Sequence, residues 1–402
     1  MSQESSAAHH PSDVRRWAIL AVSTWAQASS SVAINGPAFL IPAMKRDLGL
    51  SLTEAASMAA LAIAGVLIML IPWGLFVDLW GERRVLLVGV LGTAGASAAA
   101  AAVESVWALG LALFAMGAFG ASTSAASGRV VIGWFPAHRR GLAMGIRQMA
   151  QPLGVAVGAI TMASIAHRWG LGAALWVPTA ASLTALVCVF VLVVDPPRAE
   201  RSATASANPY RESSFLARIH VASALLVIPQ FVVWTFALTW LIDHRGWDTD
   251  LAGIAVATMH LCGALGRIGV GHLSDVVGSR VRPMRWVALV GALTLGLLAL
   301  FDQTPLAVLL MVFASAISVA DNGLAFTSVA ERAGDYWAGR ALGVQNSGQY
   351  AVAAAAAPMA GLAITHLGYA ATFAVIAVAP ALAIPVVPSR DEDRARPAST
   401  HG

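Results

Sequence analysis

The sequence predicts an all-helical membrane protein with twelve transmembrane helices in two pseudo-symmetric six-helix bundles. The first observation is composition: of 402 residues, 58% are hydrophobic and 11% are charged. A soluble domain carries about 25% charged residues, so long apolar stretches of this chain must face lipid. The other two observations are twelve apolar runs of bilayer-spanning length and a set of residues that recurs at a nearly constant interval.

The predicted spans follow one another along the chain, and each needs about 20 to 25 residues to cross a bilayer. They cover residues 17–43, 52–77, 84–103, 106–134, 142–166, 170–194, 215–242, 249–274, 284–301, 305–331, 338–365 and 369–388. Ser51 with Glu54 three residues later predicts the start of the second span, and Asp248 predicts that of the eighth. Thr304 followed by Pro305 predicts the start of the tenth.

Polar stretches divide the chain into five parts. These are a cytoplasmic tail (1–16), a first bundle (17–194), a cytoplasmic linker (195–214), a second bundle (215–389) and a cytoplasmic tail (390–402). The first residues contain no short apolar segment that ends in a cleavage-like site. We therefore expect a solvated tail there and not a signal peptide.

The 25 Lys and Arg residues predict the orientation of the chain. With the N-terminus inside, four of them lie in outer loops, Lys45, Arg46, Arg168 and Arg245, and three lie within spans, Arg129, Arg147 and Arg267. The other eighteen lie in inner segments or the adjoining helix ends. By the positive-inside rule, this predicts a multi-pass protein of the cell (inner or plasma) membrane with both termini in the cytoplasm.

A repeat with a period of 197 to 198 residues predicts that the six-helix unit is duplicated. After the second and eighth spans, Gly74, Asp78, Gly81 and Arg83 recur as Gly271, Asp275, Gly278 and Arg280. After the fourth and tenth spans, Gly141, Ala143, Gly145 and Gln151 recur as Gly339, Ala341, Gly343 and Gln349. The linker then joins the two copies.

Composition excludes or disfavours several classes of function. The net charge of +4 does not indicate nucleic-acid binding, because the basic residues are spread through short loops. Cys188 and Cys262 lie in separate apolar runs, so we expect no disulfide, no metal site and no cofactor. No reactive set of side chains indicates an enzyme. The expected partners are a small-molecule substrate, protons and the lipid bilayer, and we expect a monomer.

The loop after the second span resembles the signature of the major facilitator superfamily of secondary transporters. That signature is Gly, three residues, Asp, two residues, Gly and then basic residues, and this chain has Gly74, Asp78, Gly81, Arg83 and Arg84 at those places. A weaker copy runs from Gly271 to Arg280. The resemblance covers the whole membrane region and implies transport by alternating access, with Glu82 and Ser279 at places that are usually basic in the family.

These loop residues are expected to form a gate that holds the two bundles together on the cytoplasmic side. Glycines allow helix ends to approach closely, and Asp78 can accept hydrogen bonds from a neighbouring helix N-terminus. Arg129 is similar to a structural arginine of the family and is assigned to the same gate. The predicted gate comprises Gly74, Asp78, Gly81, Arg83, Arg84, Arg129, Gly271, Asp275, Gly278 and Arg280. Alternatively, Arg83 and Arg84 are ordinary positive-inside anchors.

The eighth span carries two candidate substrate-binding residues, His260 and Arg267, which are seven residues apart and share one helix face. The spacing of Arg267 and Asp275 resembles the nitrate and monocarboxylate branches, where the arginine meets the substrate anion. A guanidinium suits a planar carboxylate. The alternatives are that Arg267 pairs with Asp275 or a helix C-terminus, and that His260 is a satisfied interhelical histidine. Nitrate fits less well, because Leu70 stands where that branch has an arginine.

The fifth and eleventh spans are repeat mates that carry polar residues at equivalent places. The candidate substrate-binding residues are Arg147 and Gln151 on the first, and Gln345, Asn346, Gln349 and Tyr350 on the second. They can line one cavity on the pseudo-twofold axis. The alternatives are interhelical hydrogen bonds worth roughly 0.6 kcal/mol each and, for Arg147, a place in the gate.

Asp321 is the one acid deep within a predicted span and is the candidate for proton coupling. A carboxylate shielded from water binds a proton more readily, as coupling to a proton gradient requires. Its alternative is a permanent salt bridge with an intramembrane arginine. The sequence thus predicts transport of a small organic anion coupled to protons. The alternative is proton-coupled efflux of drugs or other hydrophobic compounds, although the export branch's fifth-span glycine and proline motif is missing around Pro152.

Overall fold

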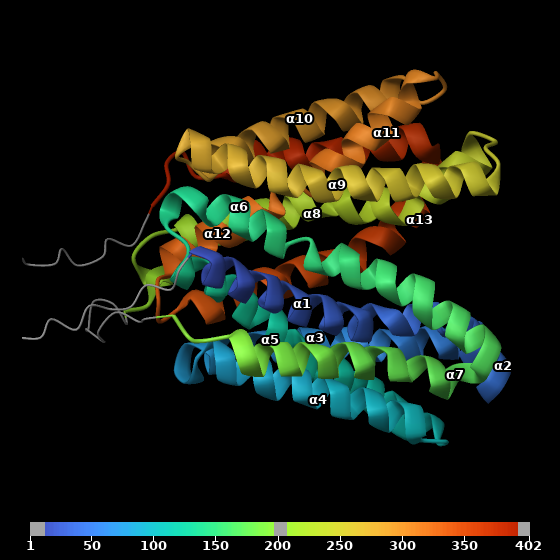
Figure 1. Cartoon of the computed structure of the whole chain (residues 1–402). Helices are drawn as coiled ribbons and strands as arrows, with labels where there is room; N and C mark the ends of the chain where they lie inside the picture. The colour runs from blue at the N-terminus through green and yellow to red at the C-terminus, as the bar shows by residue number, and fades with distance from the viewer. Residues whose placement is uncertain (1–12, 197–206, 393–402) are drawn as a thin grey trace, which may run out of the picture.

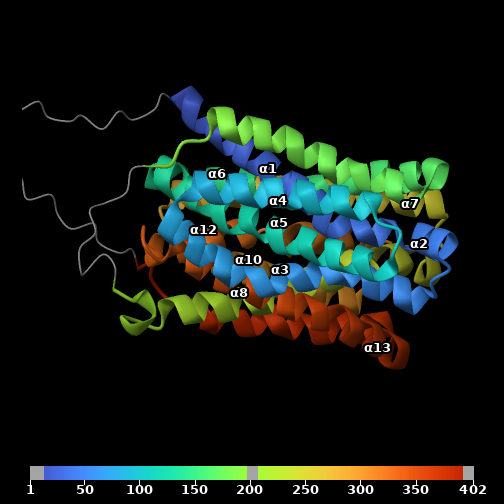
Figure 2. The ribbon, with the colours of Figure 1, turned by 90° about the horizontal axis from the view of Figure 1, so that it is seen from below.

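The computed structural model describes residues 13–196 and 207–392, and all regular structure in these ranges is helical. The predicted tails and linker lie partly outside these ranges. The helices form two bundles whose long axes run in roughly the same direction (Figure 1). Both described ranges begin and stop at the same end of the molecule, which is here called the linker end (Figure 2).

The helices are consecutive in both bundles. The first bundle comprises α1 (Asp13–Phe39), α2 (Ile41–Leu48), α3 (Leu52–Trp80), α4 (Glu82–Ala102), α5 (Val106–Trp134), α6 (Ala137–Arg147) and α7 (Ala150–Leu192). The second comprises η1 (Pro209–Arg211), α8 (Phe215–Thr239), η2 (Trp240–His244), α9 (Thr249–Val277), α10 (Val281–Leu300), α11 (Leu306–Ile317), α12 (Asn322–Ala333) and α13 (Ala338–Val386).

Within the described ranges, nine helical segments are long and apolar enough to cross a membrane. Two of these, Ala137–Leu192 and Ala338–Val386, hold two crossings each, because the chain turns at Gly170 (φ 85°) and Gly368 (φ 80°). A side chain is disfavoured at such positive φ, so glycine permits both turns. Together with α1, these segments give the predicted twelve helices, and the fold class is confirmed.

The predicted helix starts are partly right. Ser51 and Glu54 form the expected capping box, with Ser51 N–H donating to Glu54 Oε2 at 2.8 Å. Thr304 is not a cap, because its hydroxyl donates back to the Phe301 carbonyl and Pro305 precedes the first residue of α11.

Two spans predicted as continuous are broken in the structure. The fifth is interrupted between Arg147 and Ala150, and the tenth between Ile317 and Asn322. The first span also ends earlier than predicted, at Phe39, and α2 follows as a separate short helix at the end opposite the linker. The two breaks place backbone and side-chain polar groups in the middle of the molecule.

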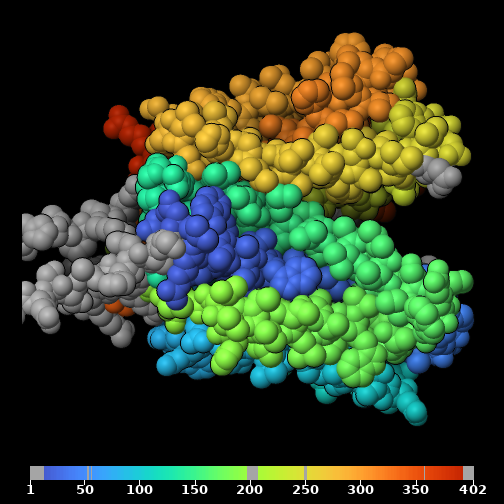
Figure 3. All heavy atoms as spheres, in the orientation of Figure 1, coloured from blue at the N-terminus to red at the C-terminus, as the bar shows by residue number. Residues whose placement is uncertain are grey.

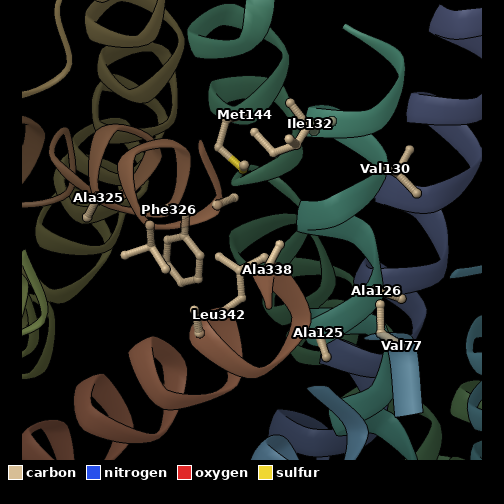
Figure 4. Packing of buried hydrophobic residues seen from close by; sticks show 14 of the residues in the cluster. Val77, Ala125, Ala126, Val130, Ile132, Met144, Ala325, Phe326, Ala338 and Leu342 are labelled. Atoms are coloured by element: carbon tan, nitrogen blue, oxygen red, sulfur yellow. The ribbon is translucent and has the colours of Figure 1, made fainter. Parts of the chain in front are cut away.

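Among the described residues, the apolar cluster that both bundles share lies toward the linker end. This cluster includes Met144 and Ile132 from the first bundle and Phe326 and Leu342 from the second (Figure 4). The other two clusters each belong to one bundle, over residues 32–175 and 232–376. Figure 3 shows the bundles separating between α7 and α9 toward the opposite end. The molecule is therefore closed at the linker end and open at the other.

Candidate functional site

The first copy of the loop motif binds the start of α13 in the other bundle. Asp78 accepts hydrogen bonds from Gly339 N–H at 2.9 Å and from Arg340 N–H at 3.1 Å, and also from Arg340 Nε at 2.9 Å. Gly74 packs directly on the Gly339 backbone, where a Cβ atom would collide. The carboxylate thus satisfies backbone donors at a helix N-terminus, where the helix dipole favours negative charge.

The second copy repeats this arrangement in the reverse direction. Asp275 accepts from Gly141 N–H at 2.9 Å and Leu142 N–H at 2.8 Å, within the first turns of α6. Gly271 packs on Gly141, and Arg280 donates to Asp275 at 2.6 Å and to the Ala137 carbonyl at 2.5 Å. Each bundle therefore places one aspartate on a helix start of the other bundle.

The arginines of the predicted gate have different roles. Arg83 donates to the Phe190 carbonyl within its own bundle, and Arg84 is exposed. Arg129 is buried between Asp78 and Glu82, at 3.3 and 2.8 Å. Glu82, unusual at this place, is therefore matched by a buried cation.

The residues that sequence reasoning missed in the gate are Arg340, Arg140 and Glu331. Arg140 and Arg280 both lie 3.3 Å from Glu331 and connect the bundles through it. Arg340 could have been found, because it directly follows Gly339 of the repeat.

Two further aspartates at the linker end were also missed. Asp195 accepts from Arg83 N–H at 2.7 Å, and Asp391 accepts from Arg280 N–H at 2.9 Å. They are 196 residues apart and so follow the internal repeat. Each closes its own bundle by binding the start of α4 or α10.

A cavity lies between the bundles beyond this gate. It is lined by Gln27, Ser30, Ser31, Ile34, Asn35, Thr123, Ser124, Gln148, Gln151, Val227, Gln230, Phe231, Asn322, Phe326, Asn346, Gln349 and Tyr350. Four of the predicted site residues are among them: Gln151, Asn346, Gln349 and Tyr350. The repeat-related fifth and eleventh predicted spans, which lie in α7 and α13, thus contribute to one cavity.

Hydrogen bonds between helices fix the amides on the second bundle's wall. Gln349 Nε2 donates to Asn322 Oδ1 at 2.9 Å and to Ser223 Oγ at 2.8 Å, and Asn322 Nδ2 donates to Gln230 Oε1 at 2.9 Å. On the facing wall, Ser127 donates to Gln27 at 2.8 Å. The cavity therefore presents oriented donors and acceptors from both bundles.

Gln345 does not line the cavity. It accepts a hydrogen bond from His220 Nδ1 at 2.5 Å, and His220 Nε2 lies 2.9 Å from the Tyr210 hydroxyl in the linker. Burial raises the pKa of Tyr210 to about 12, so this hydroxyl stays protonated. Gln345 thus ties α13 to α8 and the linker.

His260 also lies outside the cavity lining. Its ring packs edge-on against Trp234, with centroids 5.3 Å apart, and its Nδ1 donates to the Val256 carbonyl at 2.9 Å. The hydrogen bond therefore lies within α9, and the ring contact reaches α8.

Two buried arginines lie behind the cavity wall and meet at one residue, Gln148. Arg147 donates to Gln148 Oε1 at 2.6 Å, to Ser127 Oγ at 2.9 Å and to the Ser124 carbonyl at 2.7 Å. Arg267 donates to the Gln148 carbonyl at 2.6 Å. In the described part of the chain, neither guanidinium forms an ion pair with an acid. Neither lines the cavity, and Arg267 is not bound to Asp275.

Asp321 occupies the break before α12 and is 1% exposed. It does not line the large cavity between the bundles but a separate, much smaller one inside the second bundle, together with Pro229 and Pro380. Among the described residues, neither carboxylate oxygen has a hydrogen-bond partner. Its neighbour Asn322 does line the large cavity, so the two cavities lie on either side of this break.

Comparison with known proteins identifies the family. The model of the Major Facilitator Superfamily matches residues 24–358 and, in a second match, residues 219–402. The chain belongs to the Major Facilitator Superfamily. As a member of this superfamily it is a transporter and not an enzyme. It is 47% identical over 380 residues to the uncharacterized MFS-type transporters Rv2994 and MT3072 of two Mycobacterium tuberculosis strains, covering 93% of this chain and 85% of each relative.

Solved structures of the superfamily share the fold at low sequence identity. The proton:xylose symporter XylE, bound to 6-bromo-6-deoxy-D-glucose, matches with a TM-score of 0.71 and 16% identity over 94% of this chain and 98% of that one. FucP in the outward conformation matches with a TM-score of 0.73 and 14% identity, over 92% of this chain and 97% of that one. The human organic anion transporter MFSD10 (TETRAN) matches with a TM-score of 0.70 and 14% identity, over 93% of this chain and 99% of that one.

Proposed function

We propose that this superfamily member carries a small polar organic anion together with protons, by alternating access through the cavity at Gln148. The observation that carries the proposal is a polar cavity backed by two buried arginines that form no ion pair with an acid among the described residues. Amides and hydroxyls dominate the lining, and its apolar side chains are Ile34, Val227, Phe231 and Phe326. Such a lining suits a solute that makes several directional hydrogen bonds.

The charge near the cavity supports an anion. Arg147 and Arg267 carry two positive charges behind Gln148, and Asp321 is the one buried acid whose charge acts on Arg267. With Asp321 protonated, this region carries two net positive charges, and with Asp321 ionised it carries one. An anion is attracted in both states, because charges interact strongly where water is excluded.

The direction of access follows from the gate. If the linker end is cytoplasmic, as the positive-inside pattern predicts, the described conformation opens the cavity to the outside. Inward opening then requires that Asp78 and Asp275 release the helix starts they bind. Rocking of the bundles about the central site is the movement that repeated folds of this kind support.

Export of hydrophobic compounds is the competing proposal. Binding of such a compound gains most from apolar contacts, whereas thirteen of the seventeen lining residues carry polar side chains. The lining therefore favours a polar solute.

The first test is thermal unfolding of the purified protein with carboxylates, inorganic anions, sugars and lipophilic cations. A ligand at 100 times its Kd stabilises by about 2.7 kcal/mol, so a carboxylate should raise the Tm. Arg147→Gln should weaken the binding of that carboxylate by about 1 to 2 kcal/mol, which is a five- to thirtyfold increase in Kd, because it removes a nearby positive charge. Arg168→Gln, at an exposed arginine, is the control and should change nothing. Stabilisation by sugars or lipophilic cations alone would contradict the anion proposal.

The second test concerns proton coupling. Asp321→Asn keeps the side-chain shape but removes the titrating group. In proteoliposomes we expect it to abolish accumulation driven by a proton gradient while solute counterflow, which needs no net proton movement, continues. Accumulation at the wild-type level would remove Asp321 from the coupling mechanism.

A further inference from the structure

We propose that Arg267 exchanges partners during transport: it binds the Gln148 carbonyl while the linker end is closed, and the Asp321 carboxylate once that end opens. The exchange makes Arg267 the positioning residue that links proton release to gate opening. This inference rests on the proposed proton coupling through Asp321 and names the regulation of that site.

The Gln148 carbonyl is available because of the local sequence. In a continuous helix it would accept from the N–H four residues later, but that residue is Pro152, which has no N–H. Arg267 Nη1 supplies the missing donor at 2.6 Å from the other bundle. The bond therefore ties α9 to the break between α6 and α7, and it exists only while these helices are together.

The guanidinium is only partly used by this bond. Arg267 is 2% exposed, and its Nε and Nη2 have no hydrogen-bond partner among the described residues. The face of Trp234 lies 5.7 Å from the guanidinium carbon. A buried charged donor without a partner is costly. This edge of the guanidinium is therefore ready for a second acceptor.

The side chain of Asp321 also lacks hydrogen-bond partners among the described residues. Both of its carboxylate oxygens lack partners in the described part of the chain, and the charges of Asp321 and Arg267 interact without an ion pair. Nε and Nη2 lie on one side of the guanidinium and form the fork that binds both oxygens of a carboxylate. His260, two turns away on α9, is the other titratable group whose charge interacts with Arg267.

The two arrangements define a cycle. In the closed arrangement Arg267 is held by Gln148, and Asp321 without a cation partner keeps its proton. When α6 separates from α9, Arg267 loses Gln148, pairs with Asp321 and displaces the proton toward the linker end. Because coupling is reciprocal, deprotonation of Asp321 must favour opening at the linker end.

The test is a distance measurement that needs neither substrate nor gradient. Spin labels are placed at the exposed positions of Arg84→Cys on α4 and Arg282→Cys on α10, in a Cys188→Ser, Cys262→Ser background in nanodiscs. In the otherwise unchanged protein we expect the fraction with a long label distance to rise with pH. Asp321→Asn should keep one mainly closed distribution that does not change with pH, with enough opening left for solute counterflow, and Arg267→Gln should lose the pH dependence.

Pro152→Ala is a second test that keeps both Arg267 and Asp321. Its result therefore cannot be explained by misfolding from the loss of a buried charged group. It gives Gln148 a helical donor that competes with Arg267, so opening should become on the order of tenfold more favourable, a shift of about one unit toward lower pH. Arg168→Gln is the control and should keep the unsubstituted response. A retained pH response in Arg267→Gln, or an unshifted one in Pro152→Ala, would overturn the exchange. If proton coupling itself fails, Asp321→Asn will instead keep both accumulation and the pH response.

Discussion

Gly271→Ala is expected to open the linker end. A Cβ atom at Gly271 would lie 2.9 Å from the Gly141 carbonyl carbon and closer still to its oxygen, so α9 and α6 cannot keep their spacing. Overpacking of this kind costs about 1 to 3 kcal/mol, which corresponds to a roughly five- to 150-fold change in the ratio of open to closed molecules. The spin-label pair on α4 and α10 would report a longer distance.

Gly269→Ala on the same helix is the matched control. A Cβ atom there would have no atom within 4 Å. Both substitutions gain the same helix propensity, up to about 1 kcal/mol, so their difference isolates the contact between bundles. Equal label distances in the two variants would mean that the glycine contact does not hold the gate.

Asp78→Ala is expected to have the second large effect. It removes the acceptor for Gly339 N–H, Arg340 N–H and the Arg340 guanidinium, and it leaves Arg129 with one acid instead of two. Removal of one partner from a buried charged pair costs about 3 to 5 kcal/mol. The closed conformation should be strongly depopulated, and transport should fall because the carrier no longer returns to it.

A double-mutant cycle separates this effect from general instability. Arg340→Gln combined with Asp78→Ala should cost less than the two single changes together, because the pair is already broken. Glu104→Gln, at an exposed acid far from the gate, serves as the control. Strict additivity of the label-distance change would show that Asp78 and Arg340 do not act together.

The fold could be predicted from the sequence because its signals are local. Apolar runs and the repeat of Gly74 and Asp78 at Gly271 and Asp275 determine which segments cross the membrane and how the halves correspond. The breaks at Arg147–Ala150 and Ile317–Asn322 were missed, because an apolar run reads the same whether or not the helix is interrupted. Pro152, four residues after Gln148, was the available signal for the first.

The candidate site was only partly predictable. Gln151, Asn346 and Gln349 lie on the cavity because amides on repeat-related helices face the axis between the bundles. Arg267 and Gln345 lie behind the cavity wall. Helix periodicity predicts the face on which a side chain lies, but it does not predict the partner to which a long side chain hydrogen-bonds. Contacts such as Arg340 with Asp78 join residues 262 positions apart, and no local pattern encodes them.

The shared apolar core near the linker end has a consequence for temperature. Opening there must bring side chains such as Phe326, Leu342 and Met144 into contact with water. The free energy that opposes this exposure is hydrophobic and weakens on cooling. The hydrogen bonds of Asp78 and Asp275 do not share that dependence. Cold should therefore shift the resting carrier toward opening at the linker end, and warmth should keep that end closed.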